Sequence, residues 1–379
     1  MKTNLLFITT KFPPSFGGIS TYSYELGRHL ADEFEKVIIL TLSQKGHDCF
    51  DLNQKFEVIR VPRVPFLSSF LLLLFSFVII PKYKINKIFA SSWFSEGVIA
   101  YACSWVFRMD YYIGCHGWEL NVWKKTFFRR RLMLMALKNA RFLFAVSSYT
   151  ESILLSLGIF KGKIAIIPNG IDFKRFSKKI NSSRLVENYG LKNKKILLTV
   201  ASLIKMKGID LVIKSLPEVL GKVPDAAYII VGDGPERNNL EDLAIKLGLK
   251  EKVIFAGSLK YPSERLLEFY AASDLFILPS YKVKDDPRIE CFGIVFLEAM
   301  ASGKPVIGTD SGGIKEVIAD NKTGLLVQQG NIKNLSAAII QILSNKTLAE
   351  KFGNAGIKHA KKFDWAITAE KYSSYIGSF

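Results

Sequence analysis

The sequence predicts an α/β fold made of two Rossmann-like domains, and three observations point to it. Short apolar, β-rich runs alternate with helical patterns along the whole chain. This pattern restarts at Lys195, after a polar stretch over residues 172–195. The 379 residues are too many for one ordinary core. Because apolar strands separated by helices form parallel sheets covered on both faces, we expect two such sheets facing each other across a ligand cleft.

Candidate strands form two series, one in each half of the chain. The first series spans residues 4–9, 36–40, 57–61, 87–90, 111–114, 142–146 and 164–167. The second spans residues 195–200, 227–231, 253–256, 275–278, 306–308 and 324–327. The polar stretch between them is typical of a domain linker. We therefore expect an N-terminal domain over residues 1–172 and a C-terminal domain over residues 173–360.

The composition is that of a folded protein and limits its partners. Hydrophobic residues make up 49% of the chain and charged residues 23%, which is typical of a globular protein and not of a disordered one. The net charge of +18 indicates a polyanion, an anionic membrane surface or an acidic substrate as partner, or serves solubility alone. Because no nucleic-acid recognition motif accompanies the charge, we expect no nucleic-acid partner.

Cysteine spacing and hydropathy indicate the compartment. The 4 cysteines include no C-x-x-C pair, so we expect reduced cytosolic thiols and no zinc site. The apolar part of the N-terminus is too short for a signal peptide. The longest apolar run, residues 66–80, is shorter than the roughly 20 residues that a spanning helix needs. We interpret it as a buried or partly membrane-facing helix.

The segment P-R-I-E-C-F-G-I-V-F-L-E, residues 287–298, is the most informative in the chain. Glu290 precedes a predicted helix, and Glu298 lies about two turns inside it. The helix N-terminus between them offers free N–H groups and a positive dipole end, which suit a phosphate. Two carboxylates on either side could bind hydroxyls, so the arrangement suits a nucleotide sugar. For this spacing alone, a capped surface helix with exposed carboxylates is the alternative.

Four further segments follow predicted strands, where ligands of such sheets bind. Paired glycines, Gly17 and Gly18, would let the backbone approach an anion, although a plain strand–helix turn explains them too. His116 follows a strand end in C-H-G-W-E, and Lys207 precedes Gly208 at a helix start. The last segment is Gly232-Asp233-Gly234, whose glycines allow close packing of a nucleotide. Each signal is weak when it is taken alone.

Together these motifs resemble the retaining, nucleotide-sugar-dependent glycosyltransferases of GT-B fold, in the glycosyl transferases group 1 family with an E-x7-E motif. The second half contributes V-A-S-L-x3-K-G, I-I-V-G-D-G-P, A-S-D-L-F-I-L-P-S, the E-x7-E segment and G-K-P-V-I-G-T-D-S-G-G. The first half contributes F-P-P-S-F-G-G-I-S-T-Y, C-H-G-W-E and I-P-N-G-I-D. The resemblance implies two facing Rossmann-like domains with a cleft between them, and a final helix over residues 361–379 that returns to the first domain.

The resemblance also implies a role for each matching residue. Glu290 would bind hydroxyls of the donor sugar and Glu298 those of the ribose, while His116 would orient or stabilise the developing cation at the anomeric carbon. Lys207 would contact the diphosphate together with the backbone N–H groups of Phe292, Gly293, Ile294, Gly17 and Gly18. The nucleotide pocket would be lined by Gly232, Asp233, Gly234 and the loop around Leu259.

One position departs from the family pattern. Relatives commonly have Arg five residues before the lysine of K-G, where this chain has Ser202. The second cationic contact to the diphosphate is then missing or comes from another residue such as Lys205. No D-x-D triplet is present, and the adjacent pair Asp285-Asp286 is a poor chelator. We therefore expect no metal and no cofactor other than the nucleotide-sugar donor.

A basic segment over residues 124–141 indicates a membrane contact. It contains seven Lys and Arg residues and no acid, and on a helix its basic and apolar residues would occupy opposite sides. Phe127 and Phe128 lie at its front. An anionic membrane surface fits this pattern, although a helix with a solvated basic face is the alternative. The residues assigned to the membrane and acceptor side are Lys124, Lys125, Arg129, Arg130 and Arg131.

The predicted function is transfer of a hexose, with mannose favoured, from a GDP- or UDP-linked sugar. The acceptor would be a lipid-linked or free saccharide in surface polysaccharide, O-antigen or glycolipid synthesis, and the enzyme would lie in the cytoplasm, peripheral on the inner face of the cell membrane. Two alternatives stay open: a nucleotide-sugar epimerase of the same fold, and a catalytically weak membrane-binding scaffold.

Overall fold

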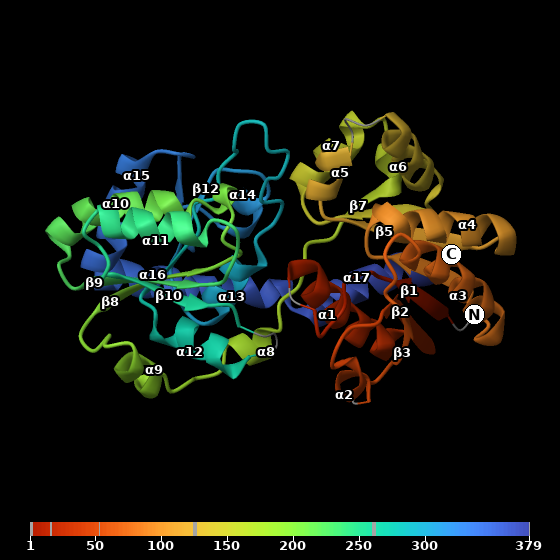
Figure 1. Cartoon of the computed structure of the whole chain (residues 1–379), viewed down its shortest axis with the longest axis horizontal. Helices are drawn as coiled ribbons and strands as arrows, with labels where there is room; N and C mark the ends of the chain where they lie inside the picture. The colour runs from red at the N-terminus through yellow and green to blue at the C-terminus, as the bar shows by residue number, and fades with distance from the viewer. Residues whose placement is uncertain (1–2, 16, 53, 124–126, 260–262, 379) are drawn as a thin grey trace. The chain divides into compact units, whose positions relative to one another are not determined.

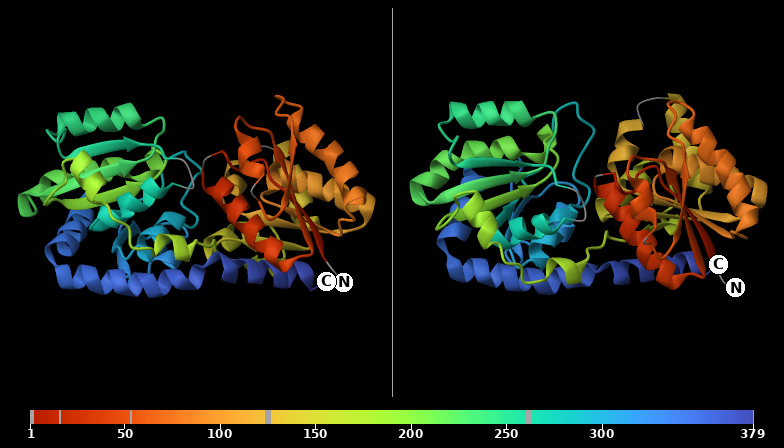
Figure 2. Two further views of the ribbon diagram at one scale, coloured as in Figure 1. Left: turned by 90° about the horizontal axis from the view of Figure 1, so that it is seen from below. Right: turned by 60° about the horizontal axis from the view of Figure 1, so that its bottom comes forward.

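The computed structural model describes residues 3–15, 17–52, 54–123, 127–259 and 263–378 and divides the chain into two compact units. The N-terminal unit comprises Met1–Gly170 and Trp365–Phe379, and the C-terminal unit comprises Ile171–Asp364. Each unit is a parallel sheet with helices on both of its faces (Figures 1 and 2). The chain therefore has the predicted α/β architecture with two sheets.

The sheet of the N-terminal unit has seven parallel strands in the order β3-β2-β1-β4-β5-β6-β7. The strands are β1 (Asn4–Ile8), β2 (Lys36–Leu42), β3 (Glu57–Val61), β4 (Lys87–Ala90), β5 (Asp110–Cys115), β6 (Phe142–Ala145) and β7 (Ile164–Ile166). The chain order reverses between β1 and β4, and ligands of open α/β sheets bind outside the carboxyl ends of the strands at such a reversal.

Helices cover both faces of this sheet and enclose two apolar clusters. On one face lie α1 (Gly18–Glu33) and the last helix, α17 (Trp365–Gly377), which pack on each other. On the other face lie α3 (Ser68–Lys82), η1 (Trp93–Gly97), α4 (Val98–Phe107) and α6 (Phe127–Asn139). The remaining helices are α2 (His47–Asp51), α5 (Trp118–Trp123), α7 (Ser148–Ser156) and the short η2 (Lys161–Lys163).

The C-terminal unit contains a six-stranded parallel sheet in the order β10-β9-β8-β11-β12-β13. Its strands are β8 (Lys195–Val200), β9 (Ala226–Val231), β10 (Val253–Gly257), β11 (Leu275–Ile277), β12 (Val306–Thr309) and β13 (Gly324–Val327). Here the order reverses between β8 and β11. The loops that follow β8, β9, β11 and β12 therefore meet at one edge of the sheet.

The helices of this unit bury their apolar faces on the sheet and on each other. They are α8 (Phe173–Phe176), α9 (Ser183–Asn188), η3 (Lys205–Lys207), α10 (Ile209–Lys222), α11 (Arg237–Lys246), α12 (Glu264–Ala272), α13 (Ile294–Ala301), α14 (Ile314–Val317), α15 (Ile332–Ser344), α16 (Lys346–Ala360) and η4 (Lys361–Phe363). Helix α10 packs against α15, and α13 packs against α16. Helix α13 is buried except for its first turn, which leaves its N-terminus at the edge of the sheet where the loops meet.

Every predicted strand is present, and the ends differ by small amounts. The largest difference is in β2, which continues to Leu42 because Thr41 and Leu42 pair with Arg60 and Val61 of β3. Helix α6 begins among the described residues at Phe127, while the predicted helix began at residue 124, and residues 124–126 lie outside the described ranges. Among the described helices, none is both long enough and apolar enough to cross a membrane.

The packing of the last helix, α17, depends on Gly170, which is the last residue of the first chain segment in the N-terminal unit. A Cβ atom at Gly170 would lie 2.4 Å from the ring of Trp365, which is 1% exposed and begins α17. We predict that Gly170→Ala destabilises the N-terminal unit by about 1–3 kcal/mol, since overpacking of a filled core has costs in this range. Thermal unfolding of the purified variant measures the effect.

Gly221→Ala is the matched control, because a Cβ atom there would meet nothing within 4 Å and the position lies in helix α10. This control should keep the unfolding temperature or raise it. Equal unfolding temperatures for the wild type and Gly170→Ala would contradict this prediction and would show that the Trp365 side chain can adopt another position.

Candidate active site

A glycine, Gly293, is the N-cap residue of α13, directly before its first residue, Ile294. Gly293 adopts φ 92°, which favours glycine, and a Cβ atom there would lie 2.8 Å from the ring of Phe296. The first N–H groups of a helix have no partner within it, and the helix dipole adds positive charge at this end. The segment Phe292-Gly293-Ile294 therefore presents backbone donors suited to a phosphate, with the Phe292 side chain buried.

An ion pair lies directly before this helix. The ammonium group of Lys207, at the end of η3, donates to Oε2 of Glu290, and both side chains are largely buried. The two residues are far apart in sequence, and they meet because the loops after β8 and β11 are neighbours. A cation and a carboxylate thus lie together where the sequence analysis assigned a diphosphate contact and a sugar contact.

Close backbone packing holds both members of the pair. Gly208 adopts φ 70°, and a Cβ atom on it would lie 2.2 Å from the carbonyl oxygen of Pro279. A Cβ atom on Gly312 would lie 2.1 Å from the carbonyl oxygen of Glu290, which accepts a hydrogen bond from the N–H of Gly313 at 3.1 Å. The Lys207 loop and the Glu290 loop are therefore fixed by their backbones.

The assigned nucleotide loop follows β9 and is packed in the same way. A Cβ atom on Gly232 would lie 1.8 Å from the carbonyl oxygen of Ala201, and one on Gly234 would lie 2.6 Å from that of Leu203. The carboxylate of Asp233 accepts from the N–H of Gly234 at 2.8 Å, so it stabilises its own turn. Leu259 is half-buried at the end of a described range, after β10.

Glu298 lies in the interior of the unit. Its side chain is 7% exposed, and its Oε2 accepts a hydrogen bond of 2.6 Å from the hydroxyl of Tyr270 on α12. Burial raises the pKa of Glu298 to about 7, although the hydrogen bond from Tyr270 lowers it. The charge of this carboxylate is therefore sensitive to pH in the neutral range.

The position that departs from the family pattern carries no cation. Ser202 is exposed, and its carbonyl oxygen accepts from the N–H of Ile204 at 2.9 Å. Lys205 lines a small pocket of about 80 Å³ together with Glu236 and Asn239. Its placement there gives no support to the idea that Lys205 replaces the missing arginine beside Lys207.

In the N-terminal unit, His116 follows β5 and is buried. Its Nε2 lies 2.9 Å from the carbonyl oxygen of Ser91, and its ring packs edge-to-face on Tyr22 at 4.6 Å. Because a carbonyl oxygen only accepts, Nε2 carries the proton and Nδ1 is an acceptor. Burial lowers the pKa of His116 to about 4, so the ring is neutral near pH 7.

Two buried carboxyl groups surround this histidine, and the sequence analysis assigned no role to either. Glu96 accepts from the N–H of Thr10 at 3.0 Å and from its hydroxyl at 2.7 Å, and burial raises its pKa. Glu119 accepts from the N–H of His116 at 2.8 Å, burial raises its pKa to about 7, and its Oε2 has no hydrogen-bond partner among the described residues. The loops after β1, β4 and β5 therefore form one polar cluster.

A signal for Glu96 exists in the sequence but is faint. The residue stands in S-S-W-F-S-E-G, shortly after a predicted strand, where only its place at the carboxyl end of the strand marks it.

Two buried hydroxyls in the C-terminal unit were also missed, because only their places after predicted strands mark them in the sequence. Ser280 follows β11 and Ser311 follows β12, and neither Oγ has a partner within the described structure. Buried hydroxyls without a partner are suited to bind a ligand.

The two glycines at the start of α1 have space around them. Gly17 adopts φ 122° at the start of α1, and Cβ atoms on Gly17 or Gly18 would meet nothing within 4 Å. An anion could approach these N–H groups. Across the described ranges, no group of three or more His, Cys, Asp or Glu side chains is placed to hold a metal ion.

The basic helix α6 has the expected two sides. Met133, Ala136 and Leu137 are buried, whereas Arg129, Arg130 and Arg131 are exposed. Phe127 and Phe128 are 82% and 70% exposed. Lys124 and Lys125, which were assigned to the same surface, lie outside the described residues.

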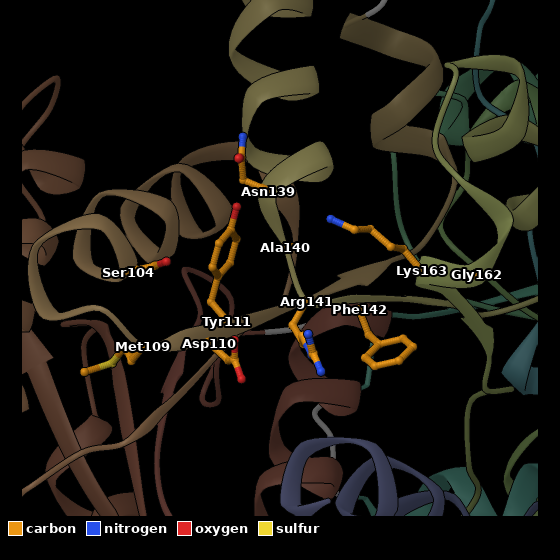
Figure 3. A pocket seen from close by; sticks show the side chains of 10 residues that line it. All are labelled: Ser104, Met109, Asp110, Tyr111, Asn139, Ala140, Arg141, Phe142, Gly162 and Lys163. Carbon is orange, nitrogen blue, oxygen red and sulfur yellow. The ribbon is translucent and has the colours of Figure 1, made fainter. Parts of the chain in front are cut away.

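A polar pocket of about 430 Å³ lies at the edge of the N-terminal sheet where the strands begin, opposite to the edge that carries His116 (Figure 3). Asp110 begins β5, whereas His116 follows its end, so this pocket is separate from the histidine cluster. Its lining includes Arg141 and Lys163, and the ammonium group of Lys163 donates to the carbonyl oxygen of Lys138 at 2.7 Å. We assign the polar pocket no part in the candidate site.

Two family models match the chain, one in each half. Residues 182–359 match glycosyl transferases group 1, and residues 16–175 match Glycosyltransferase Family 4. The group 1 match includes Lys207, Glu290 and Glu298, and the other match includes His116.

Curated relatives match nearly the full length. A GDP-mannose-dependent alpha-(1-6)-phosphatidylinositol monomannoside mannosyltransferase of Mycolicibacterium smegmatis is 28% identical over 365 residues, which cover 95% of this chain and 94% of the relative. A GDP-mannose-dependent monoacylated alpha-(1-6)-phosphatidylinositol monomannoside mannosyltransferase of Corynebacterium glutamicum is 27% identical, covering 98% of this chain and 97% of the relative.

Solved structures confirm the fold. Anabaena Alr3699/HepE in complex with UDP has a TM-score of 0.83 and 20% identity, with all of both chains covered. WaaG, a glycosyltransferase involved in lipopolysaccharide biosynthesis, has a TM-score of 0.74 and 21% identity, covering 99% of this chain and 100% of that one. The chain therefore belongs to the glycosyltransferases of GT-B fold, with its C-terminal half in the glycosyl transferases group 1 family.

Proposed function

We propose that this glycosyltransferase moves a hexose, with mannose favoured, from a GDP- or UDP-linked sugar to a lipid-linked saccharide in glycolipid or surface polysaccharide synthesis. The observation that supports the donor class is the ion pair of Lys207 and Glu290, which lies directly before the N-terminus of α13. The choice of mannose and of a lipid acceptor rests on the names of the relatives from Mycolicibacterium smegmatis and Corynebacterium glutamicum.

Lys207 and the N-terminus of α13 would stabilise the leaving nucleoside diphosphate. Negative charge grows on the phosphate oxygen as the bond to the sugar breaks, and fixed donors aimed at that oxygen stabilise it most. The ammonium group and the N–H groups of Phe292, Gly293 and Ile294 supply such donors. The backbone contacts of Gly208 and Gly312 hold them in place, so little reorganisation is needed.

Glu290 and His116 would act on the sugar. In this proposal, Glu290 accepts hydrogen bonds from sugar hydroxyls while it stays paired with Lys207, and Nδ1 of His116 accepts from another hydroxyl. The developing sugar cation would be repelled by a charged imidazole. The neutral ring that burial produces is therefore suited to lie near the anomeric carbon.

The proposed transfer retains the configuration at the anomeric carbon. The bond from that carbon to the phosphate oxygen breaks, the acceptor hydroxyl oxygen forms a new bond on the same face, and its proton passes to the departing phosphate oxygen. Glu298 would bind the ribose hydroxyls, and the loop of Gly232, Asp233 and Gly234, with Leu259 nearby, would border the nucleotide. Gly17 and Gly18 would add N–H donors, and Ser202 would contribute no charge.

The exposed face of α6 would hold the enzyme on an anionic membrane. Arg129, Arg130 and Arg131 stand beside the exposed rings of Phe127 and Phe128. A basic helix with adjacent aromatic side chains is typical of interfacial binding, in which apolar side chains enter the headgroup region and cations meet anionic lipids. In this proposal the enzyme is peripheral on the inner face of the cell membrane.

We predict that the protein releases GDP from GDP-mannose, or UDP from a UDP-hexose, only when membrane lipid extract is present. Chromatography of the nucleotide and extraction of the labelled lipid measure the transfer. Interconversion of the sugar nucleotide without acceptor would instead show an epimerase. Absence of both reactions, with vesicle binding intact, would show a scaffold.

Within this assay, Lys207→Met should lower the transfer rate and weaken nucleotide binding by about ten- to a hundredfold, because a charge-assisted hydrogen bond contributes about 1.5–3 kcal/mol. Lys205→Met is the matched control on the same turn and should bind the nucleotide like the wild type. Calorimetric titration with GDP and UDP, without added metal, measures both affinities. Equal losses in the two variants would contradict the assignment of Lys207.

We also predict that nucleotide affinity rises with pH through neutrality. Glu298 has a pKa of about 7 in the free protein, so it is mostly protonated below that pH. Ribose hydroxyls donate more strongly to the ionised form, so binding below pH 7 must expel a proton, and the affinity falls up to tenfold for each pH unit below the pKa. Calorimetry in buffers of different ionisation enthalpy counts the protons released.

Glu298→Gln separates this effect from titration of the nucleotide phosphate itself. The variant should bind more weakly at pH 8 and should lose the proton release that belongs to the carboxyl group. An unchanged proton count would assign the release to another group, of which Glu119 is the first candidate because its pKa is also raised to about 7.

For the membrane contact, we predict that changing Arg129, Arg130 and Arg131 together to Glu weakens binding to anionic vesicles by at least about a hundredfold. Each basic residue near such a surface contributes about 1 kcal/mol, so the loss of three is sufficient for this effect. Co-sedimentation with phosphatidylglycerol-containing vesicles measures it. Changing Lys358, Lys361 and Lys362 to Glu alters the net charge equally and should have little effect; equal losses would indicate a response to net charge alone.

A further inference from the structure

A second pocket of the N-terminal unit, of about 340 Å³, lies among α3, η1, α4 and α6. These four elements pack on one another on one face of the sheet, and Figure 1 shows α3 and α4 as neighbours. The volume is within the range of about 300–1,000 Å³ that is usual for small-molecule sites. We refer to it as the apolar pocket.

Hydrocarbon side chains make up nearly all of its lining. Phe70 and Leu73 come from α3, Trp93 and Phe94 from η1, and Ala102 from α4. The indole N–H of Trp93 donates to the carbonyl oxygen of Glu119 at 3.4 Å, so it is already used. Among the described residues of the lining, the polar ones besides Arg129 are two serines, Ser69 and Ser95.

This lining selects the kind of occupant. A buried water molecule needs two to four polar partners, and the walls of this pocket contain few polar groups. A peptide would bring backbone N–H and C=O groups that also need partners. A hydrocarbon chain needs none, and it would cover Phe70 and Phe94, which are 54% and 46% exposed.

One charged residue of the lining indicates what the chain is attached to. Arg129 belongs to the wall of the apolar pocket, and Arg130 and Arg131 follow it on α6. None of the described residues that line the pocket is acidic. A guanidinium group binds phosphate well. The combination of an apolar pocket with a cation in its wall fits an amphiphile with a phosphate head.

The pocket and the candidate site share one structural element. Within η1, Trp93 and Phe94 face the apolar pocket, and Glu96 belongs to the polar cluster with Thr10 and His116. A lipid whose chain lies in the pocket would therefore have its head group near the carboxyl ends of β4 and β5, where an acceptor sugar is needed.

We infer that the apolar pocket binds one hydrocarbon chain of the phosphate-bearing lipid acceptor, with the phosphate at Arg129. This inference rests on the proposed function in that the acceptor is a lipid. It adds a site for the lipid tail that is separate from the donor site of the C-terminal unit.

Monomeric lysophosphatidylglycerol, used below the concentration at which it forms micelles, is the probe. It should bind the whole protein in a calorimetric titration and should compete with membrane lipid extract in the transfer assay by raising the apparent KM without lowering kcat. Ala102→Phe, which fills the pocket from α4, should weaken probe binding by more than about tenfold, because the chain loses the burial of several methylene groups. GDP and UDP binding should not change.

Val106→Phe is the matched control, because Val106 lies on the same helix, is 49% exposed and does not line the pocket. Ser69→Trp, which fills the pocket from the exposed side of α3, replaces Ala102→Phe if that variant does not fold. Arg129→Gln should reduce the preference for lysophosphatidylglycerol over lysophosphatidylcholine.

The outcomes separate this inference from the proposed function. Equal probe affinity in the wild type and the filled variants would overturn the pocket assignment, even if lipid transfer continues. Probe binding without competition against the lipid extract would overturn the assignment to the acceptor. Probe binding that the filled variants abolish, in a protein that transfers no sugar to lipid, would leave a lipid site and reject the glycosyltransfer proposal.

Discussion

Close backbone packing at the carboxyl edge of the C-terminal sheet is the constraint on which the candidate donor site depends. At Gly208, Gly232 and Gly312, a Cβ atom would lie between 1.8 and 2.2 Å from a carbonyl oxygen of a neighbouring loop. No side chain fits at such distances, so the loops after β8, β9 and β12 can adopt this arrangement only with glycine there. The pairing of Lys207 with Glu290 follows from that arrangement, since it joins side chains from loops whose backbones are already in contact.

Burial sets the charges in both units. Glu298 and Glu119 both have a pKa raised to about 7, while that of His116 is lowered to about 4, and in each case loss of solvent is the largest cause. These three buried groups therefore do not account for the net charge of +18. Part of this positive charge lies on the exposed arginines of α6. The interior would favour a polar, neutral sugar, and the surface would favour an anionic lipid.

The sequence was sufficient to predict the strands, because each is a short apolar run that must be covered on both faces. It also predicted the two sides of α6, since helical periodicity separates Met133 and Leu137 from Arg130 and Arg131. It could not predict that Lys207 pairs with Glu290, because that contact depends on which loops are neighbours at the sheet edge. The idea that Lys205 takes the place of the missing arginine gains no support from the structure, in which Lys205 lines a small pocket together with Glu236.

Glu96 and the apolar pocket escaped prediction for a common reason, which is the conformation of η1. Ser95 adopts φ 57° and ψ −59°, a conformation that costs about 1–3 kcal/mol in a residue with a side chain and that no local sequence rule anticipates. It turns the chain so that Trp93 faces the apolar pocket while Glu96 accepts its hydrogen bonds from Thr10. Those hydrogen bonds, together with the close fit of Gly97 against Ile113, hold the turn in place. A regular helix here would rotate one of the two side chains away, so the apolar wall and the buried carboxylate exist together only while this turn is kept.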